Sequence, residues 1–122
     1  MEKISHFRDL RVWQEGHKLV LMIYDLTSNF PADEKFGLIS QMRRAVVSVT
    51  SNVSEGFGRA HAPNKIQFYN IAKGSLLELE NQLIIAKDLD YVSENRFKLA
   101  LNQIITVSKL LAGFTKTAPS RE

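Results

Sequence analysis

The chain has 122 residues, enough for one domain with its own hydrophobic core, and it has no cysteine, which excludes disulfides, thiolate metal sites and cysteine nucleophiles. No stretch approaches the roughly 18 apolar residues of a membrane span, and no apolar run follows the first Met, so we expect a cytoplasmic protein without a membrane partner. The formal charge is only +3, but residues 41–73 hold five Lys or Arg against one Glu, which favours an anionic partner.

Four segments of the chain have apolar residues at helical spacing, and no segment alternates in the way of a β-strand. We therefore predict an all-α protein that forms a single domain over residues 1–122. The first helix is predicted over residues 10–29 and ends before Pro31. Trp13 and His17 both fall on its apolar seam, and we expect His17 to be a hydrogen-bonded residue of the core.

The second helix is predicted over residues 34–55, with Gly56 in a left-handed conformation at its exit. Its apolar core stripe repeats in alternating steps of three and four, and residues 46–54 carry no charged side chain. A second stripe, of polar residues, follows the core stripe by two positions. Because each residue turns the helix by about 100°, this stripe falls on the far side of the helix. This polar seam consists of Gln41, Arg44, Ser48, Ser51, Asn52 and Glu55.

The polar seam has two interpretations. A polar stripe on a bundle helix is ordinarily a solvated face. Val, Ser, Thr and Asn are mediocre helix formers, however, so residues 46–54 need packing from outside their own helix. We therefore prefer a contact between copies of the chain, or a buried polar network, at or near this seam.

The third helix is predicted over residues 63–89, with Pro63 in its first turn, and the fourth over residues 94–114, with Ser93 as its N-cap. The tail, residues 115–122, is expected to be frayed. Four helices of similar length joined by short connections favour an antiparallel up-down-up-down four-helix bundle.

The chain resembles the bacterial four helix bundle family associated with intervening sequences in 23S rRNA, over about residues 7–114. The resemblance rests on FRDLRVWQEGHKL, on YDLTSNFPADEKFGLISQMRRAVVSVTSNVSEGFGR and on FYNIAKGSLLELENQLIIAKDLDY. It implies a ring-like homopentamer with a basic surface that contacts nucleic acid. Accessory proteins of diversity-generating retroelements, which work beside a reverse transcriptase, share this fold group. The polar positions that match the family motifs are Glu34, Gln41, Arg43, Arg44, Ser48, Asn52, Glu55, Arg59, Ser75 and Glu78.

Two residues depart from the pattern of that family. Gly16 stands where alanine is expected, which costs about 1 kcal/mol in helix propensity unless a neighbouring helix packs closely there. Asp90 stands where glycine is usual, and aspartate tolerates a left-handed conformation better than most residues. Neither substitution is expected to change the fold.

The sequence predicts no catalytic site, no metal site and no cofactor. A metal site in a bundle needs histidine three residues after a glutamate, and Asn81 follows Glu78 at that spacing. Glu78 and Glu80 are two residues apart, so they point to different faces and form no ready acid/base pair.

We therefore predict a non-enzymatic oligomer, a pentamer by family resemblance, that binds nucleic acid, with RNA favoured over DNA. The alternative is a protein-interaction scaffold, such as an accessory subunit to a reverse transcriptase, and a hydrolase or metal enzyme ranks third. Phosphate contacts are expected from Arg43, Arg44, Arg59, Lys65 and Lys73. A subunit interface or buried polar network is expected from Gln41, Ser48, Ser51, Asn52, Glu55 and Glu78.

Overall fold

The computed structural model of the chain describes residues 4–118, and within them there are four α-helices, two short 3-10 helices and no β-strand. The all-α prediction is confirmed, and the arrangement fits a four-helix bundle. No helix of this part of the chain is long and apolar enough to cross a membrane. In chain order the elements are η1 (Phe7–Asp9), α1 (Arg11–Thr27), η2 (Ala32–Glu34), α2 (Leu38–Phe57), α3 (Ala62–Asp88) and α4 (Glu94–Lys116).

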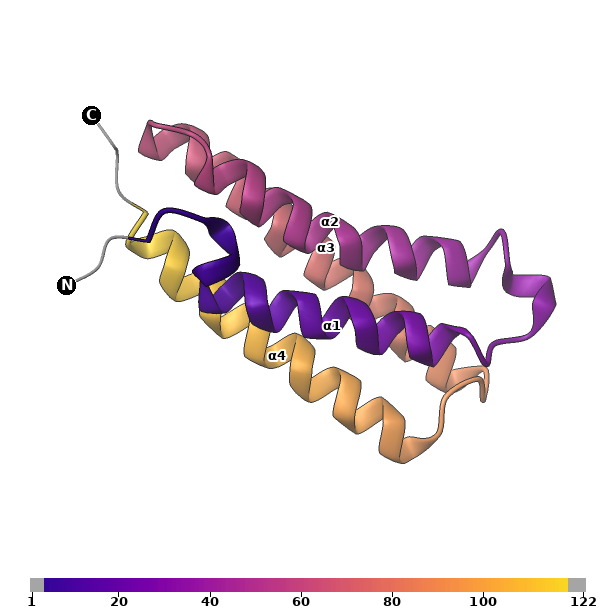
Figure 1. Cartoon of the computed structure of the whole chain (residues 1–122). Helices are drawn as coiled ribbons and strands as arrows, with labels where there is room; N and C mark the ends of the chain where they lie inside the picture. The colour runs from indigo at the N-terminus through magenta and orange to yellow at the C-terminus, as the bar shows by residue number, and fades with distance from the viewer. Residues whose placement is uncertain (1–3, 119–122) are drawn as a thin grey trace.

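The four α-helices lie side by side, and each packs on two neighbours (Figure 1). Both α1 and α3 pack on α2 and on α4, and the contact between α2 and α3 is the most extensive. The α1–α2 and α3–α4 connections lie at one end of the molecule, and the α2–α3 connection lies at the other (Figure 1). The core between the helices consists of aliphatic side chains from all four, among them Leu19, Ile23, Val49, Leu79, Leu83 and Ile104.

The start of α2 differs from the prediction. The helix begins at Leu38 instead of residue 34, because Ala32–Glu34 forms the separate 3-10 helix η2. The Glu34 carboxylate then accepts a hydrogen bond from the Leu38 backbone N–H at 3.1 Å, which satisfies one of the free donors at the start of α2.

The end of α2 also differs, because the helix continues through Gly56 to Phe57. No glycine within residues 4–118 has a positive φ, so the expected left-handed exit at Gly56 is wrong. Gly56 is buried against α3, and a Cβ atom there would lie only 2.5 Å from Cε1 of Tyr69. Glycine at this position therefore permits a close approach between α2 and α3.

The second half of the chain follows the prediction more closely. The Ser93 hydroxyl accepts a hydrogen bond from the Arg96 backbone N–H at 3.2 Å, so Ser93 is the N-cap of α4 as predicted. Asp90 has φ 63°, the left-handed conformation that its short polar side chain tolerates. The helix α4 extends to Lys116, into the stretch expected to fray, and residues 119–122 of that stretch lie outside the described part.

An aromatic cluster at the start of α1 corrects the expectation for His17. The His17 ring is exposed and stacks on Trp13, with centroids 4.9 Å apart and an interplanar angle of 10°. Trp13 is half-buried and also contacts Phe7, at 5.4 Å between ring centroids.

Gly16 is the residue of α1 that faces α2, since a Cβ there would lie 3.1 Å from Cγ2 of Thr50. This close packing explains the glycine.

A hydrogen bond ties η2 to the α3–α4 connection, because the Tyr91 hydroxyl donates to Glu34 Oε2 at 2.9 Å. This bond, together with desolvation and the negative charges of Glu34 and Asp33, raises the pKa of the Tyr91 phenol above its ordinary value of 10.0. A raised pKa in the folded state means that the stabilising contribution is complete below the unfolded pKa. It is lost as the pH rises through the folded pKa.

We therefore expect Tyr91→Phe to be less stable than the wild-type protein near pH 8, with a difference that shrinks as the pH rises past 10.0. Urea unfolding followed by circular dichroism at pH 8 and pH 11 measures both differences. A stability difference that stays constant over this range would show that the phenol proton has no part in the contact.

Candidate nucleic-acid interface

The five cationic residues predicted to contact phosphate lie in different environments. Arg43 and Arg44 are near the start of α2, Arg59 follows its end, and Lys65 and Lys73 are on α3. At 1.5 Å per residue, Arg44 lies about 20 Å along α2 from the C-terminal end of that helix. The structure therefore does not gather these residues into one cluster within the chain.

Arg43 is held against α1. Its Nε donates to Thr27 Oγ1 at 2.9 Å, and Nη2 donates to the carbonyl oxygen of Tyr24 at 3.2 Å. The guanidinium also lies over the Tyr24 ring, 4.5 Å from the ring centroid. These contacts fix the side chain, while its half-buried position keeps part of the guanidinium accessible.

The structure corrects the expectation for Lys65. Only 2% of this residue is exposed, and its ammonium donates to the backbone carbonyl oxygens of Gly56 at 3.4 Å and Phe57 at 3.0 Å. These are carbonyls of the last turn of α2, where a helix leaves acceptors unpaired and carries partial negative charge. Lys65 is therefore a buried cap of α2, with no access to a phosphate.

Arg59 is exposed and pairs with a residue that was expected at the subunit interface. Its Nη2 lies 3.3 Å from Glu55 Oε2, and its guanidinium lies 4.8 Å from the centroid of the Phe68 ring. An exposed pair of this kind contributes about 0–1 kcal/mol to stability, so it is easily exchanged for another partner. Glu55 nevertheless lowers the positive potential beside Arg59.

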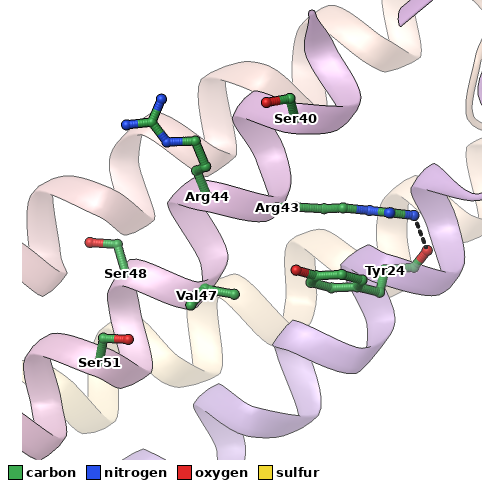
Figure 2. Close-up of a pocket in the computed structure, with 7 residues that line it drawn as sticks. All are labelled: Tyr24, Ser40, Arg43, Arg44, Val47, Ser48 and Ser51. Carbon is green, nitrogen blue, oxygen red and sulfur yellow. Dashed lines mark hydrogen bonds between the residues drawn. The ribbon is translucent and has the colours of Figure 1, made fainter. Parts of the chain in front are cut away.

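A shallow groove of about 560 Å³ runs along the outer side of α2 and reaches α1. Arg43 and Arg44 leave the helix in different directions, Arg43 toward Tyr24 and Arg44 away from it (Figure 2). Arg44 is exposed and has no hydrogen bond or ion pair with any residue of the described chain, and on its α3 side it shares a small pocket with Glu78. No carboxylate lines this serine groove, which is formed by Tyr24, Ser40, Arg43, Arg44, Val47, Ser48 and Ser51.

The serine groove combines three kinds of group that a sugar-phosphate backbone uses. A guanidinium offers several N–H donors to phosphate oxygens, and serine hydroxyls both donate and accept hydrogen bonds. The ring of Tyr24, 41% exposed, offers an apolar surface at the edge of the groove. The groove therefore suits a polyanion that also carries hydroxyl groups.

The polar seam lies closer to α3 than predicted. The hydroxyls of Ser48 and Ser75 are hydrogen-bonded at 2.8 Å, and Asn52 Nδ2 donates to Ser48 Oγ at 3.0 Å. Ser48 and Asn52 thus belong to a half-buried polar network inside the chain instead of the far side of α2. The reason is that Ala45 and Gly56 are buried in addition to the predicted core stripe, which widens the core face of α2 toward α3.

The other seam residues, Gln41, Ser51 and Glu55, are exposed. Glu78 is also exposed, and its Oε2 accepts a hydrogen bond from Gln82 Nε2 at 3.1 Å. The other polar atom of this buried amide, Gln82 Oε1, has no partner within residues 4–118. Buried carbonyl acceptors of this kind are nearly always hydrogen-bonded, so Gln82 Oε1 is an exception within the described residues.

Sequence reasoning missed Tyr24, Ser40 and Val47 as groove residues. Ser40 and Val47 stand four residues before and three after Arg44, so they could have been found by extending the stripe of Arg44 along the helix. Nothing in the sequence joins Tyr24 to them, because its place depends on how α1 packs on α2. Among the described residues, no three His, Asp or Glu side chains gather where they could hold a metal ion.

Comparison with known proteins gives a family and a fold. The sequence profile described as 23S rRNA-intervening sequence protein matches residues 8–113. A crystal structure from Bacteroides thetaiotaomicron, of a protein of unknown function from the S23 ribosomal protein family, superimposes with a TM-score of 0.77 at 22% sequence identity. The similarity covers 87% of this chain and 99% of that one, and at this identity it shows the fold alone. No curated protein matches the chain.

Proposed function

We propose that this chain, which belongs to the 23S rRNA-intervening sequence protein family, binds RNA through the serine groove and catalyses no reaction. The observation that carries the proposal is the lining of that groove. It presents one guanidinium without a partner in the described chain, that of Arg44, one fixed guanidinium, and the hydroxyls of Ser40 and Ser51, with no carboxylate among the lining residues.

RNA fits the serine groove better than DNA does. The sugar of RNA carries a 2′-hydroxyl that both donates and accepts hydrogen bonds, and it is the group by which proteins distinguish RNA from DNA. Ser40 and Ser51 supply hydroxyls of the same dual character beside the two arginines, whereas the Ser48 hydroxyl is bonded within the chain. Binding would depend mainly on backbone contacts, with little reading of the base sequence.

We further propose that the bundle has the up-down-up-down order and assembles into a homopentameric ring. The outer surface of α3 supports a contact between copies, because it exposes large apolar side chains, and exposed groups of this kind mark protein contacts. They are Ile66, Ile71, Ile84 and Ile85. One side of α3 borders α2, and it carries Ile71, Glu78 and Ile85 at seven-residue spacing. Both isoleucines are more than 40% exposed.

A ring would also repeat the serine groove once in every subunit. Five copies of a modest positive site can bind one RNA at several points, which strengthens the overall affinity without any new contact.

The proposed function is tested by replacing Arg44 with alanine. We expect affinity for a structured RNA hairpin to fall several-fold at low salt, and the slope of log K against log salt concentration to decrease in magnitude by about 1 per lost phosphate contact. Fluorescence anisotropy of labelled RNA over a salt series measures both quantities. The matched control is Arg11→Ala, because Arg11 is an exposed arginine about 20 Å from Tyr24 along α1.

Two results would contradict RNA binding at this groove. One is a wild-type affinity that does not change with salt, and the other is an equal loss of affinity in the Arg44 and Arg11 variants.

A protein-interaction scaffold is the second candidate function, and Phe36 is the observation that favours it. This aromatic side chain is 88% exposed in the α1–α2 connection, and Leu89, 50% exposed, lies in the α3–α4 connection at the same end of the bundle (Figure 1). Exposed apolar groups of this size mark protein contacts. A partner such as a reverse transcriptase would stay bound to the purified protein after nuclease treatment, whereas a partner bridged by RNA would be lost.

A further inference from the structure

A second groove, of about 370 Å³, lies between α3 and α4, and the proposed RNA contact does not use it. Leu111, only 2% exposed, lies at its floor, while Leu77 on α3 is 62% exposed. Lysines from both helices border it. This lysine groove is defined by Lys73, Leu77, Ser108, Leu111, Ala112 and Lys116.

The two lysines of this groove differ from several others in the chain. Lys18 and Lys87 each have a carboxylate 3.0 Å away, from Glu15 and Glu94 respectively. Lys73 and Lys116 form no ion pair within residues 4–118, and none of the residues that line the groove is acidic. An anionic ligand can therefore pair with both ammonium groups without competition from a carboxylate of the groove.

The walls of the lysine groove restrict the chemistry of that partner. No aromatic ring is among the residues that line it, so a nucleobase would have nothing to stack on. Leucine and alanine side chains, together with the aliphatic stems of the two lysines, suit a saturated hydrocarbon chain. The volume falls within the roughly 300–1,000 Å³ of small-molecule sites.

We propose that the lysine groove binds an aliphatic carboxylate, with its hydrocarbon chain against Leu77 and Leu111 and its carboxylate beside Lys73 and Lys116. The hydrocarbon covers a leucine that is otherwise exposed to water, and the carboxylate gains two ammonium partners. Neither contact involves the serine groove. The site is thus independent of RNA binding and would remain if the RNA proposal failed.

Octanoate is the probe for this site, because it is an aliphatic carboxylate that is soluble as single molecules. Titration into isotopically labelled protein, followed by amide chemical shifts, is expected to give saturable shifts around Leu77 and Ala112. Lys73→Ala/Lys116→Ala is expected to weaken binding at least tenfold, and 1-octanol should bind at least tenfold more weakly than octanoate. The matched control is Lys18→Ala/Lys35→Ala, which removes the same charge away from the groove and should bind octanoate as the wild type does.

Leu77→Asp provides a second test that does not depend on the lysines. This side chain is exposed, so the variant should fold, which circular dichroism verifies, and it should lose octanoate binding because it places a carboxylate in the groove. Three outcomes would overturn the proposal: no saturable binding, equal affinity for octanol and octanoate, or unchanged octanoate affinity in the double lysine variant. A Leu77→Asp protein that sediments as a smaller species than the wild type would also overturn it, by showing that another copy of the chain covers the groove.

Discussion

Replacing Gly56 with alanine is expected to lower the free energy of unfolding by about 2 kcal/mol, a typical value for an overpacked core. The added Cβ would lie 2.5 Å from Cε1 and 2.9 Å from Cδ1 of Tyr69, and 3.1 Å from Cβ of Phe68. Tyr69 cannot easily move away, because it is 1% exposed and packs on the Phe114 ring at 4.8 Å between centroids. Relief would require α2 and α3 to separate.

Gly74→Ala is the matched control for this prediction. A Cβ at Gly74 would have no atom within 4 Å, so the alanine meets open space. The substitution should raise the free energy of unfolding by about 0.5–1 kcal/mol, since alanine is the better helix former. Urea unfolding followed by circular dichroism gives both values. Equal effects of the two substitutions would mean that α2 and α3 are not closely packed at Gly56.

Lys65→Met is the second substitution with a large expected effect. Methionine keeps the apolar stem but removes the ammonium. The Phe57 carbonyl oxygen then loses that donor, whereas the Gly56 carbonyl oxygen keeps the Arg59 backbone N–H at 3.1 Å. An unsatisfied buried group costs about 1–3 kcal/mol, so a destabilisation of that size is expected. Lys73→Met, which changes an exposed lysine of the same helix, should alter stability by no more than about 0.5 kcal/mol.

The same variant separates the structural role of Lys65 from a role in binding. The folded Lys65→Met protein should bind the RNA hairpin with wild-type affinity, because the buried ammonium does not reach the surface. A variant that keeps its stability and loses RNA affinity would instead support the interpretation from the sequence, in which Lys65 contacts phosphate.

Apolar periodicity predicted the four helices, because each buries a stripe that repeats at helical spacing. The limits of α2 were not predictable in the same way. Its start depends on the Glu34 carboxylate, which accepts a hydrogen bond from the Leu38 backbone N–H. The Tyr91 hydroxyl, from the α3–α4 connection, donates to the same carboxylate. Its end depends on Gly56, where glycine serves a tight packing contact and not a left-handed turn. Both are tertiary effects that local propensity does not contain.

The candidate site was predicted in part. Charge placement identified Arg43 and Arg44, which do line the serine groove, but it gave the same weight to Lys65. Charge alone cannot show that a lysine lies next to the last carbonyls of the preceding helix. Ser48 lies closer to α3 than the apolar stripe predicted, because small residues such as Ala45 are also part of the core face of α2.

The stack of Trp13 on His17 makes the bundle easy to follow optically. The chain has one tryptophan, so all of its indole emission comes from the first turns of α1. Tyr24, where the serine groove meets α1, is about 16 Å further along that helix at 1.5 Å per residue. Emission should therefore change when the bundle unfolds and stay constant when RNA fills the groove. The same sample then reports stability by fluorescence and binding by a label on the RNA.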